Sequence, residues 1–393
     1  MSKVSIIKLG MHPFADTFIS EKYLGSPEPV YSLECLLDTE TGHVSVKYPT
    51  KAKERYNLYD YSYTASNSKV SRDHWDIYSI HVPDKLKLPK GSAVLEIGSN
   101  DGYLLGKFCD RGYTASGVDS AYNMCSLARE KGLNTYCGIF SKYTATTLAS
   151  EGVKVDLVVA NNVYNHANDP VDFALGVKEV LNPGGVFVFE VPYWYNTITD
   201  KKFDQIYHEH VSYFTVKSAC NVLASAGLEV FDVEWIPYHG GSIRVYASAD
   251  TSRKKTNDVK VFIKQEEEAR LFDPSMYKNF MHSITFRRNT FLQKLYSIAT
   301  HSNAPIVGVG AAAKGNTFLN FYNLDSTIID YVTDSSEFKI GKYTPLSRIP
   351  IESDEVVFSK YSKVYAIILS WNISEHIKEK LKGINKNIEF ITP

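Results

Sequence analysis

Residues 94–105, VLEIGSNDGYLL, decide the fold of this chain. An apolar strand there runs into a loop and then a helix, so that glycines let the backbone approach a ligand and the helix N-terminus offers free N–H donors. Asn100 stands where the GxGxxG dinucleotide motif has its second glycine, although asparagine tolerates the left-handed conformation that such a loop can need. The stretch also lacks the GxxxxGK(S/T) pattern of nucleoside triphosphatases, so we expect a different small-molecule site here.

Short β-branched runs alternate with amphipathic helical segments after this stretch, which is typical of a parallel α/β sheet. A late strand within residues 240–250 closes the first series, and a second series begins at residues 304–322, APIVGVGAAAKGNTFLNFY. The sequence therefore predicts two Rossmann-like α/β domains. The predicted divisions are a turn-rich, tyrosine-rich N-terminal lid module (1–88), the first α/β domain (89–250), bridging helices (251–300) and the second α/β domain (301–393).

Composition narrows the class of protein. Lys and Arg number 43 against 44 Asp and Glu, so a polyanion such as DNA is not expected as the main partner. The five cysteines are scattered and never spaced CxxC, which favours reduced thiols and a cytoplasmic protein. The sequence has no run of about 18 apolar residues and no signal-peptide pattern at its start, so we expect no membrane span.

An acidic residue follows the next strand. Asp119 lies seventeen residues after Gly102, where a carboxylate can hold the two ribose hydroxyls of a nucleoside. An ExG loop followed by this acid is typical of class I S-adenosylmethionine (SAM) methyltransferases, and CGIF at 137–140 lies where such folds meet the adenine. The alternative is an ordinary strand–loop–helix crossover. The predicted cofactor residues are Glu96, Gly98, Asn100, Asp101, Gly102, Asp119, Ile139, Phe140 and Asn161.

Titratable side chains are unusually dense in residues 204–214, DQIYHEHVSYF. Two histidines near a glutamate are also compatible with metal ligation, but HxH lacks further ligands at recognisable spacing, and general acid–base chemistry is favoured because histidine titrates near neutrality. Either histidine alone is also compatible with a purely structural role. His166 follows the strand that ends at Asn161 and Asn162, at the sheet edge where open α/β folds bind ligands, although it is equally able to cap a turn there.

Five segments taken together resemble the deoxysugar C-methyltransferase family, whose members act on nucleotide-linked keto sugars. They are EIGSNDGYLL (96–105), NNVYNH (161–166), YHEHVSYF (207–214), HGGSIRV (239–245) and GVGAAAKGNTFLNF (308–321). The similarity covers nearly the whole chain in the same order and includes SWN at 370–372. It implies an N-terminal zinc-binding module, a central SAM domain and a C-terminal Rossmann-like domain.

The sequence departs from this family at the N-terminus. Family members hold zinc there with cysteine pairs, whereas YSLECLLDTETGHVSV at 31–46 keeps only Cys35. Four zinc ligands cannot be assembled from that segment, so we predict no structural zinc and a lid held by packing.

The resemblance also implies roles for individual residues. His210 would be the general base, Tyr207 and Glu209 would lie beside the sugar, and His166 and Asn162 would line the same cleft. Tyr59, Tyr61 and Tyr63 would cover the sugar nucleotide, although tyrosines in such a module more often serve packing.

A chemical hypothesis follows from these roles. His210 removes a proton next to a 4-keto group, and the resulting enolate, stabilised by Tyr207 or a water, attacks the methyl group of SAM. Glu209 orients a histidine or a sugar hydroxyl. Lys314 lies in the second glycine-rich loop, where it is placed to meet a diphosphate; the alternative is a structural C-terminal domain with Lys314 in solvent.

Other functions remain open from the sequence. Methylation of a sugar oxygen or nitrogen needs no enolate. A catalytically silent sugar-nucleotide or SAM binding protein, and an NAD-dependent sugar oxidoreductase, are further alternatives. The sequence fixes neither the nucleotide, nor the sugar, nor the carbon that is methylated.

Overall fold

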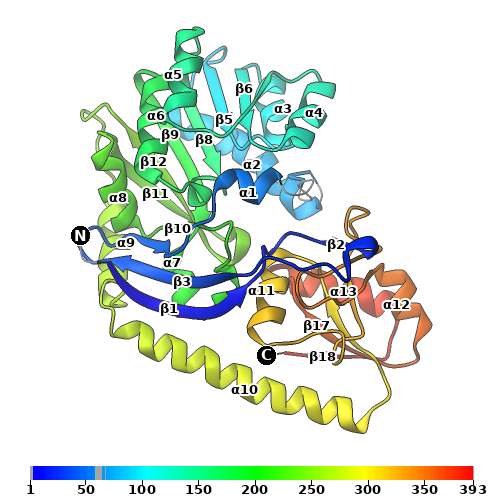
Figure 1. The fold of residues 1–393 in the computed structure, drawn as a ribbon. Coiled ribbons are helices and arrows are strands. Elements are labelled where there is room, and N and C mark those ends of the chain that lie inside the picture. Colours follow the sequence, from blue (N-terminus) through cyan, green and yellow to red (C-terminus); the bar gives the residue numbers. More distant parts are fainter. Residues whose placement is uncertain (1–2, 58–63, 67, 393) are drawn as a thin grey trace.

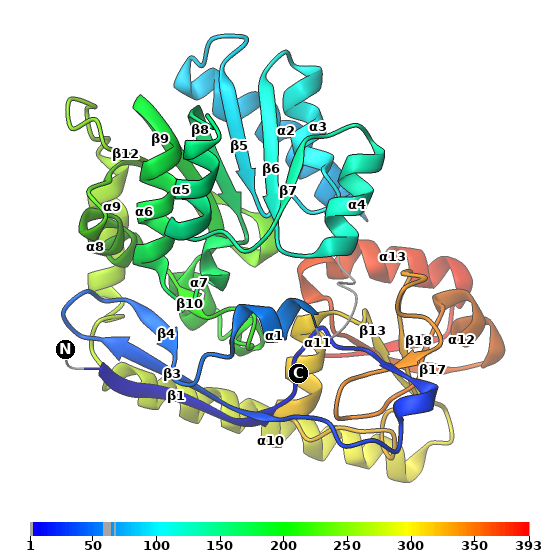
Figure 2. The same cartoon turned by 45° about the horizontal axis from the view of Figure 1, so that its top comes forward.

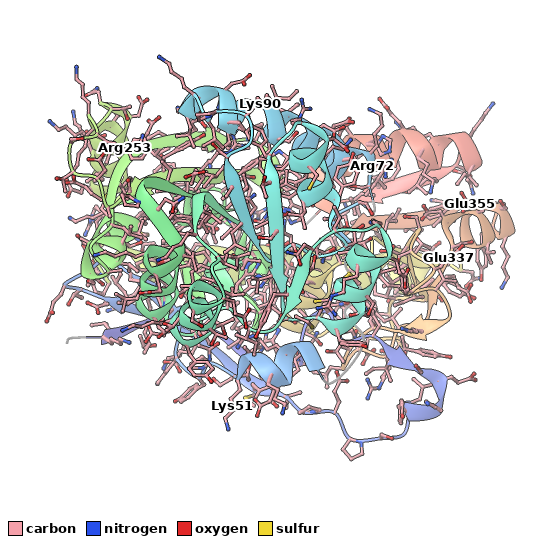
Figure 3. All side chains as sticks on the ribbon, turned by 90° about the horizontal axis from the view of Figure 1, so that it is seen from above. Lys51, Arg72, Lys90, Arg253, Glu337 and Glu355 are labelled. Carbon is pink, nitrogen blue, oxygen red and sulfur yellow. The ribbon has the colours of Figure 1, made fainter. Side chains whose placement is uncertain are left out.

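The computed structural model describes residues 3–57, 64–66 and 68–392. The first α/β domain lies above the N-terminal strands, the C-terminal α/β domain lies beside them, and one long helix runs below (Figure 1). In the described residues, no helix is both long enough and apolar enough to cross a membrane. Charged side chains such as Lys51, Lys90 and Glu355 lie at the rim of the molecule when it is seen from above (Figure 3).

The first α/β domain is built on a seven-stranded sheet with the order β11-β12-β9-β8-β5-β6-β7. Only β12 runs antiparallel to its neighbours on both sides within this sheet of described residues. The class I methyltransferase fold expected from the sequence is therefore confirmed. The strands are β5 (Ala93–Ile97), β6 (Thr114–Asp119), β7 (Thr135–Cys137), β8 (Val155–Asn161), β9 (Leu181–Pro192), β11 (Glu229–Ile236) and β12 (Ser242–Ser248).

Helices cover both faces of this sheet because alternate strand residues point to opposite sides. Val94 and Leu157 pack on one side with two helices, while Leu95 and Val158 pack on the other with four. The first pair is α2 (Lys69–Leu86) and α3 (Tyr103–Asp110). The other four are α5 (Lys142–Ser150), α6 (Pro170–Val180), α8 (Val216–Ser225) and α9 (Asp258–Glu268), and α4 (Tyr122–Glu130) connects β6 to β7. The structure thus packs α2, within the predicted lid range, against the first α/β domain.

The C-terminal α/β domain carries a five-stranded parallel sheet with the order β16-β14-β13-β17-β18. This confirms the second α/β series, and Figure 2 shows α13 on the side of this domain that faces the first one. The strands are β13 (Ile306–Val309), β14 (Tyr331–Thr333), β16 (Ile351–Glu352), β17 (Val364–Ile368) and β18 (Ile388–Ile391), and the helices are α11 (Ala313–Phe321), α12 (Asp354–Lys360) and α13 (Ser374–Ile384).

The N-terminal segment forms a sheet that the sequence patterns did not mark. Its order is β1-β3-β4-β10, and β10 comes from Ser212–Tyr213, two residues after His210. The N-terminal strands are β1 (Lys3–His12), β3 (Tyr31–Asp38) and β4 (Val44–Val46); β2 (Ile19–Ser20) pairs with β15 (Lys342–Tyr343) of the C-terminal domain, and α1 (Ala52–Asn57) follows β4.

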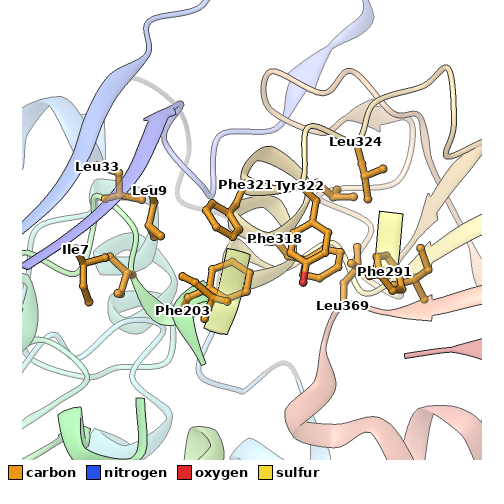
Figure 4. Close-up of a cluster of buried hydrophobic side chains, with 14 of the residues drawn as sticks. Ile7, Leu9, Leu33, Phe203, Phe291, Phe318, Phe321, Tyr322, Leu324 and Leu369 are labelled. Carbon is orange, nitrogen blue, oxygen red and sulfur yellow. The ribbon is translucent and has the colours of Figure 1, made fainter. Parts of the chain in front are cut away.

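One apolar core joins the N-terminal sheet to the C-terminal domain. Ile7 and Leu33 belong to the same buried cluster as Phe203, Phe318 and Leu369 (Figure 4). The long helix α10 (Met276–His301) runs beneath both and adds buried rings to this core. Burial of apolar area contributes roughly 25 cal/mol for each Å² removed from water. The shared core therefore holds the N-terminal sheet and the C-terminal domain in a fixed arrangement.

Candidate active site

A cavity of about 860 Å³ lies between the two α/β domains and the N-terminal segment. It is lined from the carboxyl ends of parallel strands in both sheets, which is where open α/β folds bind ligands. Of the residues predicted from the sequence, those that line it are Glu96, Gly98, Asn100, Asp119, Ile139, Phe140, Asn161, Asn162, His166, Tyr207, Glu209, His210 and Lys314. Tyr59, Tyr61 and Tyr63 lie outside the described residues.

The glycine loop after β5 is tightly constrained. Gly98 has φ +74°, and a Cβ placed on it would lie 2.1 Å from Cγ2 of Val163. Asn100 has φ 51°, the left-handed conformation that the sequence analysis allowed for it. The carboxylate of Asp119 accepts hydrogen bonds from the backbone N–H groups of Asn100 and Ala121, both at 2.8 Å. Asp119 therefore fixes the loop and still presents its oxygens at the cavity wall.

Among the described residues, Glu96 has one carboxyl oxygen without a partner beside this loop. Its side chain is buried, and Oε2 has no hydrogen-bond partner within the described part of the chain. Burial, and then the charges of Asp119 and Asp101, raise the pKa of Glu96 well above its ordinary value. A buried carboxyl oxygen without a partner is costly, so this site fits a ligand that brings a positive charge or a donor.

Two predicted cofactor residues lie outside the cavity wall. The Asp101 carboxylate accepts from the Ser66 hydroxyl and from Nζ of Lys131, which is 3.1 Å away. Asn100 Oδ1 likewise accepts from the backbone N–H of Ala65 at 2.8 Å. Gly102, with φ +79°, precedes α3 and packs against Leu133. Asp101 therefore ties the segment before α2 to the glycine loop, and its contact with the cofactor stays a prediction.

His210 is held in one tautomer. Its Nδ1 lies 2.9 Å from the carbonyl oxygen of Gln205, and since a carbonyl only accepts, Nδ1 carries the proton. Nε2 is then the acceptor, and the hydroxyl of Tyr207 donates to it at 2.7 Å. Burial, followed by the charge of Lys314, lowers the pKa of His210 to about 3. The ring is neutral at physiological pH, and its Nε2 accepts the Tyr207 hydroxyl at the cavity wall.

The loop after β8 brings a second histidine to this point. The rings of His166 and His210 have centroids 5.2 Å apart, and burial lowers the pKa of His166 well below its ordinary value. Arg55 of α1 donates from Nη2 to the backbone oxygen of His166 at 3.0 Å and to Oδ1 of Asn168 at 2.7 Å. Sequence spacing gave no signal for Arg55, because these two partners lie more than a hundred residues away.

The other two members of the YHEH segment point to different surroundings. Glu209 is buried at the cavity wall, and burial together with the charge of Asp16 raises its pKa to about 7. His208 packs instead between Phe14 and Tyr31, with ring centroids 6.1 and 5.7 Å away. The two histidines of HxH therefore face apart. Within the described ranges, no group of three or more His, Cys, Asp or Glu side chains has metal-binding geometry.

Lys314 lies at the start of α11 in the C-terminal domain and is 8% exposed. Burial lowers its pKa to about 8, against the opposing effect of the Asp204 carboxylate. Its Nζ lies 5.0 Å from the centroid of the Trp371 ring. The alternative of a solvated Lys314 is wrong, because the folded chain buries this ammonium at the cavity wall.

Comparisons with known proteins agree with this geometry. Residues 80–233 match a family described as a methyltransferase domain, and residues 237–393 match one described as a C-methyltransferase C-terminal domain. The chain is an S-adenosylmethionine-dependent methyltransferase. Its cofactor is S-adenosylmethionine, and a cavity wall with the carboxyl groups of Glu96 and Asp119 fits a molecule that has a cationic group and a ribose.

Individual relatives cover different shares of this methyltransferase. The C-methyltransferase NovU of Streptomyces niveus is 27% identical over 99% of this chain and 92% of its own length. A ubiquinone biosynthesis O-methyltransferase of Roseobacter denitrificans is 31% identical, but over only 25% of this chain and 40% of its own. A solved SAM-dependent methyltransferase of Clostridium acetobutylicum is 15% identical with a TM-score of 0.37, covering 47% of this chain and 92% of that one.

Proposed function

We propose that this methyltransferase transfers a methyl group to a carbon of a nucleotide-linked 4-keto-deoxysugar, with His210 as the base. The observation that carries the proposal is the fixed tautomer of His210. Its Nε2 accepts a tyrosine hydroxyl at the wall of the cavity, and that cavity continues to the cofactor loop. Transfer to carbon needs a base that makes a carbon nucleophile, and a neutral imidazole held in place is a suitable one.

Proton transfer sets the roles of the surrounding residues. His210 Nε2 takes the proton from the carbon next to the ketone, and the Gln205 carbonyl stabilises the imidazolium through Nδ1–H. Tyr207, released from Nε2, stabilises the enolate oxygen by donating a hydrogen bond from its hydroxyl. Bound S-adenosylmethionine supplies an activated methyl group for the carbon nucleophile. Glu209, whose pKa near 7 leaves it partly protonated, hydrogen-bonds a sugar hydroxyl.

The C-terminal domain contributes the site for the nucleotide. Lys314 offers a buried ammonium at the carboxyl edge of a parallel sheet, where a diphosphate is well matched by charge and by the helix N-terminus. The Lys314 charge also lowers the pKa of His210. A bound diphosphate that neutralises this charge would raise the pKa of His210, so substrate binding would strengthen the base.

Mass spectrometry tests the function. The enzyme is incubated with SAM and a thymidine-diphosphate 4-keto-6-deoxyhexose deuterated next to the ketone. We expect a methyl group on carbon and loss of the deuterium, because the proton must leave before the carbon attacks. A methyl group found on oxygen or nitrogen, with the deuterium retained, would show the alternative sugar O- or N-methylation.

A further inference from the structure

The carbonyl that fixes His210 belongs to a three-residue helix, η3 (Phe203–Gln205), which is docked on the C-terminal domain. The ring of Phe203 packs on two aromatic rings of the C-terminal domain (Figure 4). Its centroid lies 4.7 Å from that of Phe321, at the end of α11, and 6.0 Å from that of Tyr322, the next residue. The next residue, Asp204, is 4% exposed. Gln205 is also buried, and its side-chain amide donates to the backbone oxygen of His239 at 3.1 Å.

Asp204 is held by the C-terminal domain through an indole. Trp371, at the start of η5 (Trp371–Ile373) after β17, donates its Nε1–H to Oδ2 of Asp204. A hydrogen bond to a buried carboxylate is among the stronger kinds in proteins. Gln205 directly follows Asp204 in the chain, and its carbonyl oxygen accepts the hydrogen bond from Nδ1–H of His210.

Several groups hold the Trp371 indole in place. The ammonium groups of Lys314 and Lys202 lie 5.0 and 5.3 Å from its ring centroid. Gly240 approaches so closely that a Cβ there would lie 2.5 Å from the ring. The indole therefore has one orientation, and that orientation aims its N–H at Asp204.

We propose that Trp371 and Asp204 are positioning residues that lock η3 to the C-terminal domain and so hold His210 in the Nδ1–H tautomer. The proposal rests on the proposed role of His210 as the base. It gives the C-terminal domain a second role besides binding substrate. Contact with that domain fixes the carbonyl of Gln205, which accepts the hydrogen bond from Nδ1–H of His210.

Nuclear magnetic resonance tests the positioning without any substrate. Long-range ¹H–¹⁵N spectra of histidine-labelled, SAM-bound enzyme report which ring nitrogen carries the proton, and the His210 signals are assigned by their loss in His210→Gln. Trp371→Phe keeps a ring but removes the N–H donor, and Asp204→Asn keeps the shape but removes the charge. The control is Trp235→Phe, since Trp235 on β11 also donates a hydrogen bond, to Asn196 at 3.0 Å, but outside the cavity wall.

We expect a single Nδ1–H tautomer in the wild type and in Trp235→Phe, and a mixture in Trp371→Phe and Asp204→Asn. The turnover number with the keto-sugar substrate should fall about tenfold in these two variants, a part of the 10²–10⁴ that loss of a general base costs, with SAM affinity unchanged. A wild-type tautomer pattern in both folded variants would overturn the proposal. Failure to methylate a keto sugar would instead count against the proposed function, because the spectra do not depend on it.

Discussion

Lys314 should give the pH profile of kcat/KM a limb on the basic side. Its pKa is lowered to about 8 by burial, so the ammonium that we propose for the diphosphate is present below pH 8 and lost above it. At pH 9 only about one lysine in eleven stays protonated, so we expect kcat/KM about tenfold below its plateau. Lys314→Met removes the charge at every pH, so its profile should have no such limb. Loss of a hydrogen bond to a charged group is worth roughly 1.5–3 kcal/mol, so the plateau of kcat/KM should be about 10- to 150-fold lower.

The assay measures initial rates of methyl transfer from pH 6 to pH 9.5 at limiting keto-sugar concentration. Lys339→Met is the matched control, because Lys339 is also a buried lysine at the cavity wall but donates to the backbone oxygen of Ala311 at 2.7 Å. Its profile should keep the limb near pH 8. A limb that persists in Lys314→Met, or a wild-type profile that is flat to pH 9.5, would refute the reasoning.

Three further changes have defined expectations. Gly98→Ala should abolish SAM binding in calorimetry, because its Cβ overlaps Val163. Gly152 has φ +88° and open space around it, so Gly152→Ala should cost only about 1 kcal/mol of stability and leave SAM binding intact. Equal SAM affinity in the two variants would contradict this. Burial lowers the pKa of His208 to about 4, so the unfolded chain binds more protons and the free energy of unfolding falls as pH drops below 6.5. Between pH 7 and pH 5, the free energy of unfolding in urea should therefore fall by about 2 kcal/mol less in His208→Gln than in the wild type. Equal losses in the two proteins would refute this. Arg244→Met leaves the buried Glu190 without its 2.9 Å partner and should lower the free energy of unfolding by roughly 3–5 kcal/mol in the same assay. A smaller loss would mean that His74 suffices as a partner for Glu190.

Sequence patterns located the first glycine loop, Asp119 and the order of the two α/β domains because each depends on local chemistry at a strand end. They could not decide which histidine of HxH faces the site, since that depends on the turn before β10, which puts His210 and Tyr207 together and sends His208 into the N-terminal core.

Contacts between distant segments were out of reach for the same physical reason. Arg55 bonds to residues more than a hundred positions away, and β10 completes a sheet begun at the N-terminus. The hydrogen bonds of Asp101 with Ser66 and Lys131 likewise join segments that are far apart in the sequence. The roles of the site residues stay predictions.

Hydrogen exchange at the acceptor carbon tests the central claim most directly. The enzyme is mixed in D₂O with the keto-sugar nucleotide and S-adenosylhomocysteine, which carries no methyl group to transfer, and deuterium entering the carbon next to the ketone is followed by NMR. Wild-type enzyme should exchange this position rapidly, and His210→Gln should be slower by about 10²–10⁴. Exchange by His210→Gln at the wild-type rate would contradict the assignment of this imidazole as the base.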